Sequence, residues 1–283
     1  MAWKIVETDY ENKNFWQEKA DYENRVEMMR VINVYPECRY QKIRGFGGAF
    51  TESSGYNLTR LPEAAQEEVI KAYFGQEGLR YNLGRTHINS CDFALGNYAY
   101  DEDEEDVSFE KFDIGRDKKY ILPMIARAKD AAGEEIELLA SPWSPPAYMK
   151  TNGEMNHGGK LKEEYRARWA EYIAHFLKEY KSAGALVSMI TVQNEPMAVQ
   201  TWDSCIYEAE EEMVFVRDYL GPTLEREGLS DVQIFVWDHN KEILFERANG
   251  VLSDEKAAKY TAGVAFHWYS GDHFEAVSLV REK

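Results

Sequence analysis

The sequence has few cysteines, no long apolar run and too few basic residues to balance its acidic ones. Its three cysteines, Cys38, Cys91 and Cys205, are odd in number and widely spaced, which predicts reduced thiols and argues against a disulfide framework or a zinc cluster. No window approaches the roughly 20 apolar residues of a membrane span, so we expect no stable membrane insertion. The N-terminus also lacks the apolar stretch of a secretory signal, and we therefore expect a cytoplasmic protein.

Positive charge is scarce: 33 basic side chains stand against 50 acidic ones, a net charge of −17. Such a chain repels phosphate backbones, so we expect no nucleic-acid partner. Six of the acidic residues form one run, Asp101 to Asp106. Carboxylates are calcium ligands, but the run lacks the glycine and the ligand spacing of a calcium-binding hand, and we interpret it as a solvated loop.

Several catalytic motifs are missing as well. The sequence has no His-Glu-x-x-His zinc helix, no phosphate-binding Gly-x-x-x-x-Gly-Lys-Ser/Thr loop and no Gly-x-Ser-x-Gly serine elbow. Its six histidines show no ligand spacing, so we expect neither a metal nor a cofactor. The glycine-rich segment from Gly45 to Gly48 lacks the dinucleotide-binding pattern and indicates a crowded position at the floor or mouth of a barrel.

What the sequence does contain is an alternation of short apolar runs and longer segments of helical period, which is typical of an α/β fold with a parallel sheet. The predicted strands are Ile43–Phe50, Leu79–Arg85, Ile136–Ala140, Leu186–Val192, Val232–Trp237 and Thr261–Trp268. The predicted helices are Pro62–Tyr73, Asp117–Ala132, Lys162–Ser182 and Glu208–Glu227, with Gly133, Gly184 and Gly228 as stops. The pattern predicts a strand–helix barrel, six strands of which are recognisable in the sequence.

In such a barrel the chemistry lies at the carboxyl ends of the strands. Polar and aromatic residues follow five of the predicted strands, with Glu195 directly after the apolar run Ile190–Val192. Cleaving a glycosidic bond requires an acid for the leaving oxygen and a second carboxylate, about 5 Å away when configuration is retained. We predict that Glu195 is the acid, with its pKa raised by a half-buried position. Asn194 beside it is placed to donate to a sugar hydroxyl.

Sugar sites combine aromatic platforms with amide, carboxylate and guanidinium partners. The candidate platforms are Trp143, Trp202, Trp237, Trp268 and Tyr269, although core packing is the better interpretation for Trp237 and for Trp169 in the third helix. We predict that Asp92 accepts from sugar hydroxyls and that Arg85 orients nearby carboxylates. The alternative is a structural ion pair between Asp92 and Arg85.

Four segments, Gly45–Glu52, Ser141–Pro146, Gln193–Pro196 and Phe266–Tyr269, together resemble glycoside hydrolase family 30, the glucosylceramidase-like retaining β-glycosidases. The resemblance implies that Glu195 is the acid/base. It also implies that a sugar is held by Arg85, Asp92, Trp143, Asn194, His239, Asn240, His267, Trp268 and Tyr269. It further implies an α/β fold, a catalytic (β/α)8 TIM barrel over residues 41–283 of which only about six strand–helix units are present. Residues 1–40 precede it as an N-terminal segment of a β-sandwich side domain or as a barrel cap.

The sequence departs from the family at the nucleophile, which is a glutamate at the end of the seventh barrel strand. Reaching that strand requires on the order of 20 to 25 residues after the sixth, and 14 follow Tyr269. Glu275 and Glu282 fall in the expected next helix. We therefore expect the nucleophile to lie beyond this chain, as in a fragment, a frameshifted product or a short protein completed by a partner, such as the remaining part of the same gene product.

Other functions stay open from the sequence alone. An endo-β-1,6-glucanase, a xylanase or a β-xylosidase of the same family would share the acid, and a non-catalytic glycan-binding fragment would share the aromatic residues. A barrel lyase or aldolase is disfavoured because no lysine stands at a suitable strand end. A β-linked carbohydrate is the expected partner in each of the glycan-related interpretations.

Overall fold

The computed structural model describes residues 5–19 and 32–283. Its contacts divide the chain into two units, residues 1–44 and residues 45–283. In the first unit, strands β1 (Ile5–Asp9) and β2 (Asn14–Lys19) form an antiparallel hairpin. The Asp9 carboxylate closes the turn by accepting from the N–H groups of Glu11 and Asn12. This hairpin agrees with the predicted strand segment of a side domain, whose residues 1–4 and 20–31 lie outside the described residues.

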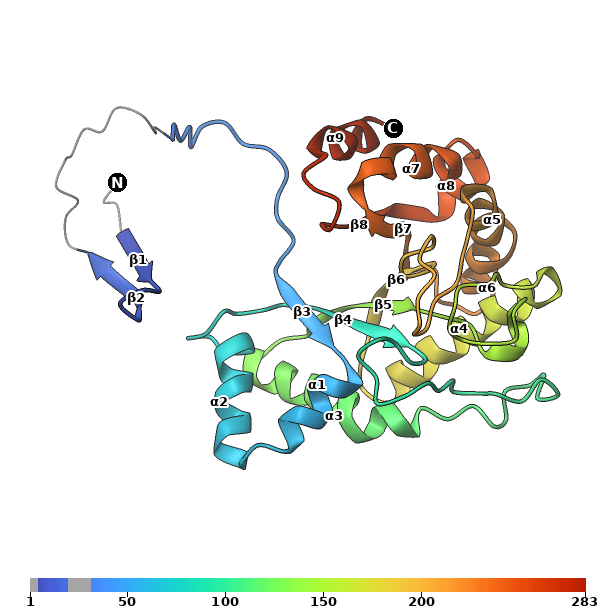
Figure 1. Cartoon of the computed structure of the whole chain (residues 1–283), viewed down its shortest axis with the longest axis horizontal. Helices are drawn as coiled ribbons and strands as arrows, with labels where there is room; N and C mark the ends of the chain where they lie inside the picture. Colours follow the sequence, from blue (N-terminus) through green and yellow to red (C-terminus); the bar gives the residue numbers. More distant parts are fainter. Residues whose placement is uncertain (1–4, 20–31) are drawn as a thin grey trace. The chain divides into compact units, whose positions relative to one another are not determined.

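The second unit is built on a parallel sheet in the order β3-β4-β5-β6-β7-β8 (Figure 1). Its strands are β3 (Gly47–Phe50), β4 (Leu83–Ile88), β5 (Glu137–Pro142), β6 (Val187–Thr191), β7 (Gln233–Asn240) and β8 (Thr261–His267). All six overlap the predicted stretches, so the α/β barrel assignment is confirmed. Strand β4 begins four residues later than predicted because Leu79 and Tyr81 donate their N–H groups back to the preceding helix.

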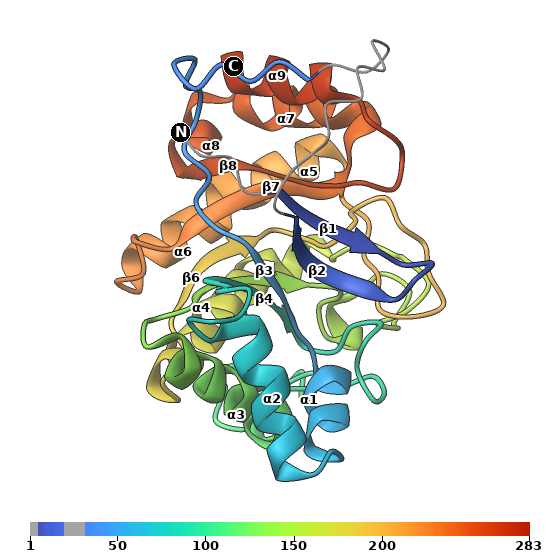
Figure 2. The same cartoon turned by 90° about the vertical axis from the view of Figure 1, so that its left-hand side faces the viewer.

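Helices connect successive strands and cover the outer side of the sheet, with α1, α2 and α3 packed together near its β3 end and α7, α8 and α9 near its β8 end (Figures 1 and 2). They are α1 (Glu52–Thr59), α2 (Glu63–Phe74), α3 (Gly115–Ala132), α4 (Arg166–Ser182), α5 (Ala209–Val214), α6 (Gly221–Arg226), α7 (Leu244–Leu252), α8 (Glu255–Tyr260) and α9 (Phe274–Glu282). Short 3₁₀ turns lie at Ala147–Met149, Glu163–Tyr165 and Lys241–Ile243. Helices α1, α7 and α8 were not predicted.

The predicted helix Glu208–Glu227 is interrupted in the structure. A π-helical segment, Phe215–Leu220, separates α5 from α6. Pro222 has no N–H to donate and disfavours a regular helix on its N-terminal side, which accounts for the wider turn. Sequence periodicity alone does not reveal this change because the buried face is continuous across it.

The core contains an aromatic stripe of α4, which includes Trp169, a residue for which we preferred core packing. Trp169, Tyr172, Phe176 and Tyr180 are fully buried. Burying each large side chain contributes roughly 1.5 to 3 kcal/mol. At the centre, the buried carboxylate of Asp117 accepts hydrogen bonds from three tyrosine hydroxyls, those of Tyr98, Tyr100 and Tyr180. The aromatic layer between the sheet and α3 and α4 is thus closed without leaving these polar atoms unpaired.

The acidic run Asp101–Asp106 is a loop, as expected, but it is solvated only in part: Glu102, Glu104 and Glu105 are exposed, whereas the two ends of the run are not. Asp101 and Asp106 are buried, and the Asp106 carboxylate accepts from the N–H groups of Glu110 and Lys111. Arg168 of α4 donates to the main-chain carbonyls of Asp103 and Asp106. Backbone hydrogen bonds and one guanidinium therefore hold the run against α4, a long-range contact that composition does not reveal.

Among the described residues, none of the helices combines the length and the apolar character that crossing a membrane requires.

The sheet remains open within the described residues, with β3 and β8 as its edges. A cavity of about 550 Å³ exposes apolar side chains of the barrel interior, among them Leu139, Met189, Phe235 and Phe266. Eight strands normally close such a barrel so that interior side chains fill it. Six strands leave this interior accessible.

The glycine-rich entry to β3 generates a stability prediction. A Cβ on Gly47 would lie 1.8 Å from the Leu83 carbonyl oxygen, whereas a Cβ on Gly48 would meet its nearest atom, on Tyr81, at 3.7 Å. We expect Gly47→Ala to lower the free energy of unfolding by about 1 to 3 kcal/mol through overpacking. Gly48→Ala is the matched control and should cost much less, as measured by urea unfolding. Equal costs for the two variants would contradict the close approach of β3 to β4.

Candidate active site

A cavity of about 520 Å³ opens at the carboxyl ends of the strands. Of the predicted site residues, Arg85, Asp92, Trp143, Asn194, Glu195, His239, Asn240, His267 and Tyr269 line it. Trp268 is not part of the lining; its ring is largely exposed and contacts Tyr269 at 5.0 Å between centroids. Trp237 is buried, as the core interpretation held. The fold therefore brings together side chains from β4 and β7 and from the ends of β5, β6 and β8.

The centre of the site is a residue that the sequence did not single out, Asp238. Its buried carboxylate accepts from Arg85 Nη2 at 2.7 Å and from Thr191 Oγ1 at 2.7 Å, and it pairs with His267 Nε2 at 3.0 Å. Burial opposes the negative charge, but Arg85 and His267 outweigh it and hold the pKa of Asp238 well below its usual range. One carboxylate on β7 thus joins side chains from three other strands, β4, β6 and β8.

Arg85 reaches across the mouth of the sheet from β4. In addition to Asp238 it donates to Ser141 Oγ at 3.1 Å and to Asn194 Oδ1 at 2.9 Å. Its guanidinium also lies over the Trp143 ring, 4.8 Å from the centroid. The carboxylate that it orients is therefore Asp238. Because Arg85 engages the oxygen of the Asn194 amide, that amide presents its nitrogen as a donor.

Glu195 stands beside His267, and this contact reverses our expectation for its pKa. His267 Nδ1 lies 3.0 Å from Glu195 Oε1, and the hydrogen bond from the imidazole lowers the pKa of Glu195 in spite of its burial. For His267, burial disfavours the charge, but hydrogen bonds to Asp238 and Glu195 raise its pKa to about 9. The predicted increase for Glu195 was wrong, since it considered burial without the imidazolium next to it.

The backbone is strained where these side chains are presented. Asn89, Glu195, Trp237 and Asp238 all have positive φ, between 47° and 75°. Left-handed conformations of non-glycine residues cost of order 1 kcal/mol or more each and gather at functional sites. At Trp237 and Asp238 the register of β7 against β8 shifts, as it does at a β-bulge.

A buried glutamate, Glu212, binds the strained backbone at Trp237. Glu212 of α5 accepts the Trp237 N–H at 2.9 Å, and Arg247 lies 3.7 Å from its other oxygen. Burial raises the pKa of Glu212 to about 7, although the Trp237 hydrogen bond and the Arg247 charge oppose that shift. The Arg247 guanidinium also lies 4.8 Å from the Trp237 ring centroid.

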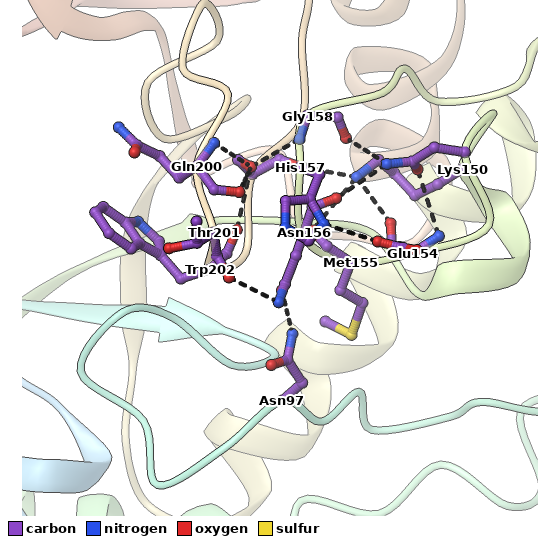
Figure 3. A network of polar contacts seen from close by, with 12 residues as sticks. Asn97, Lys150, Glu154, Met155, Asn156, His157, Gly158, Gln200, Thr201 and Trp202 are labelled. Atoms are coloured by element: carbon purple, nitrogen blue, oxygen red, sulfur yellow. Dashed lines mark hydrogen bonds and ion pairs between the residues drawn. The ribbon is translucent and has the colours of Figure 1, made fainter.

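One wall of the cavity, carrying Gln200 and Trp202, is tied to the loop after β5 by the network in Figure 3. The buried Lys150 Nζ donates to the main-chain oxygens of Ser204 at 2.7 Å and Glu154 at 3.2 Å. Burial lowers the pKa of this lysine. Asn156 adds a bond from Nδ2 to the Thr201 carbonyl at 2.9 Å. The network fixes the loop after β6 against the loop after β5.

Thr51, His87, Phe93 and Gln200 also line the cavity and were not predicted. For His87, the two hydrogen bonds define the tautomer: Nδ1 faces the Asn89 carbonyl, and Nε2 accepts the Glu52 N–H at 3.2 Å. The sequence signal for His87 was its place at the end of a strand. No short motif surrounded it.

A parallel strand–helix sheet whose carboxyl ends surround a cavity with a carboxylate, an amide, a guanidinium and aromatic rings is the arrangement of a TIM-barrel glycoside hydrolase. Comparison with known proteins specifies the family. Residues 43–279 match the glycosyl hydrolase family 30 TIM-barrel domain, and the chain belongs to this family.

Similar proteins within the family have different named activities. The lysosomal acid glucosylceramidase of Mus musculus is 34% identical over 255 residues, covering 87% of this chain and 49% of the relative. An endo-1,6-β-D-glucanase of Neurospora crassa is 30% identical, covering 85% and 50%. The crystal structure of SrfJ from Salmonella typhimurium is 40% identical with a TM-score of 0.91, covering 99% of this chain and 63% of that one. This chain spans about half the length of the curated relatives that it matches.

Glu212 makes folding stability depend on pH. Its pKa of about 7 in the folded protein lies above the ordinary 4.5, so the folded state binds the proton more tightly. Its contribution to stability is complete below about pH 4.5 and is lost as pH rises through 7, which amounts to about 3 kcal/mol.

We expect Glu212→Gln to remove this part of the pH dependence, because the amide still accepts from Trp237 and carries no charge. Urea unfolding at about pH 5 and about pH 8 measures the difference. Glu210→Gln, an exposed position on the same helix, is the matched control and should retain the wild-type difference. An unchanged difference in Glu212→Gln would show that the buried carboxyl does not take up the proton.

Proposed function

We propose that this chain is the acid/base part of a retaining β-glycosidase that acts on β-glucosides, with Glu195 as the acid/base. The supporting observation is the position of Glu195: it follows β6, lines the cavity and lies among Asn194, Arg85 and Asp92. In the proposed reaction Glu195 protonates the leaving oxygen and then deprotonates the attacking water. The Asn194 amide donates to a hydroxyl beside the reacting carbon.

The second carboxylate, in this proposal, comes from polypeptide that pairs with the free edge of β8. Support comes from the accessible barrel interior and from the length of the relatives, which is about twice the matched region. Glu275 and Glu282 lie in α9, outside the cavity lining. A carboxylate about 5 Å from Glu195 would also raise the pKa of Glu195 by like-charge repulsion, against the effect of His267. The same group would thus serve as nucleophile and keep the acid protonated.

An apolar group on the leaving side of the substrate is favoured by the cavity rim. Phe93, Trp202 and Tyr269 are exposed large apolar residues that line the cavity. Exposed apolar side chains that gather at a cavity mark a binding surface rather than ordinary exposure. We therefore propose a β-glucoside with a lipid-like aglycone, in keeping with the glucosylceramidase named among the relatives.

The second candidate is endo-acting hydrolysis of a β-1,6-glucan. Two observations favour it: the endo-1,6-glucanase relatives and the aromatic rings of Trp143, Trp202 and Tyr269 along the cavity, on which successive sugars would stack. Product analysis separates the two activities, since an exo-acting glucosidase releases glucose alone and an endo-acting enzyme releases oligosaccharides.

The decisive experiment compares residues 1–283 with a version extended by the polypeptide that completes the barrel. We expect negligible turnover of 4-nitrophenyl β-glucoside by the short chain and clear turnover by the extended one. In the extended protein, Glu195→Gln should lower kcat/KM for an alkyl β-glucoside, whose leaving oxygen must be protonated, by about 10² to 10⁴ through loss of acid catalysis, while Glu210→Gln should not change it.

If residues 1–283 alone were fully active and Glu195→Gln abolished that activity, the second carboxylate would lie within residues 1–283. Sugar binding without hydrolysis by the extended protein would favour a glycan-binding role. An α-configured first product, detected by proton NMR, would rule out retention at a β-glycoside.

A further inference from the structure

Three metal-ligating side chains converge in the cavity, although the histidine spacing in the sequence gave no sign of it. Glu195, His239 and His267 each offer one ligand atom, and these atoms all lie within 4.8 Å of one another. They come from the ends of β6, β7 and β8, three neighbouring parallel strands. This proximity depends on the strand order and therefore does not appear as a local motif.

His267 is held in the orientation of a metal ligand. Its Nε2 faces Asp238 Oδ1 at 3.0 Å, and its Nδ1 faces Glu195 Oε1 at 3.0 Å. In metal sites a ligating histidine commonly donates its second ring N–H to a carboxylate, which fixes the tautomer and the ring. Asp238 is placed for that role, and it is itself anchored by Arg85 and Thr191.

His239 adds an imidazole with unused binding capacity. Its Nδ1 is buried and has no hydrogen-bond partner in the part of the chain that the structure describes. The ring packs on Trp237 at 5.2 Å between centroids and meets His267 edge-on at 6.1 Å. These two ring contacts hold the side chain near the other two ligands.

We propose that Glu195, His239 and His267 bind a divalent transition metal ion such as Zn²⁺ in the sugar cavity, and that the bound ion blocks the site. Imidazole and carboxylate are ligands for Zn²⁺ and Cu²⁺, and three protein ligands leave a position open to water. Two ligand atoms on a tetrahedral zinc lie roughly 3.3 Å apart. The 3.0 Å between His267 Nδ1 and Glu195 Oε1 is close to that distance. The ion takes the place of the proton between His267 and Glu195, and binding releases that proton.

Metal binding by this cluster is independent of whether the chain hydrolyses sugars, and only the blocking of activity rests on the proposed function. The ion would occupy the carboxylate that is proposed to meet the leaving oxygen. Hydrolysis by the extended protein should therefore be inhibited by Zn²⁺ and restored by a chelator. The binding itself can be measured with residues 1–283.

The test is calorimetric titration of residues 1–283 with zinc chloride at about pH 8, with the absorbance of bound Co²⁺ as a second readout. We expect one ion per chain, and an affinity at least about tenfold lower in His239→Gln and in Glu195→Gln. His273→Gln is the matched control: His273 lies 3.7 Å from the Glu275 carboxylate but is outside the cluster, so its loss should not change the affinity.

Circular dichroism establishes whether each variant is folded. If His239→Gln is unfolded, the affinity of Glu195→Gln for zinc tests the proposal. No binding by the wild-type chain, or equal affinity in all the variants, would overturn the proposed metal site. Zinc binding that depends on Glu195 and His239 in an extended protein without hydrolysis would contradict the proposed function and leave the metal site standing. Hydrolysis by an extended protein that does not bind zinc would support the proposed function and overturn the metal site.

Discussion

The buried carboxylate of Asp238 is the interaction on which the rest of the site depends. The carboxylate holds Arg85 of β4, Thr191 of β6 and His267 of β8. The main-chain oxygen of Asp238 accepts the Glu195 N–H at 3.0 Å. Removing one partner of a buried charged network commonly costs about 3 to 5 kcal/mol because the other charges remain unpaired. Asp238 therefore constrains the backbone turn that presents Glu195 through its main-chain oxygen, and it holds the imidazole that determines the charge of Glu195 through its carboxylate.

Strain and burial elsewhere in the structure serve the same arrangement. The left-handed backbone at Trp237 and Asp238 would relax without external support, and Glu212 of α5 supplies it by accepting the Trp237 N–H. The support costs stability above neutral pH, since the Glu212 carboxyl is buried and its pKa is raised to about 7. A helix on the outer side of the sheet is thus coupled to the geometry of the site at the strand ends.

Much of this could be predicted from the sequence. Apolar runs and glycine stops predicted the six strands, helices α2, α3 and α4, and the span that α5 and α6 share, and the position of Glu195 after a strand placed it in the cavity. Asp238 was missed because its role comes from partners on three other strands, which no local pattern reveals. The pKa of Glu195 was predicted in the wrong direction for the same reason, since His267 lies far from it in the sequence. The buried part of the acidic run likewise depends on Arg168, a contact formed only in the folded chain.

The most direct test measures the charge of the His267 imidazole as a function of pH. Side-chain NMR of histidine-labelled protein monitors this charge from about pH 6 to about pH 10. If Asp238 and Glu195 hold the imidazolium between them, His267 titrates near pH 9, and Asp238→Asn shifts that titration to lower pH. Asp231→Asn, an exposed position in the turn before β7, should leave it unchanged. A His267 titration near its ordinary value of 6.5 in the wild-type chain would contradict the central role of Asp238.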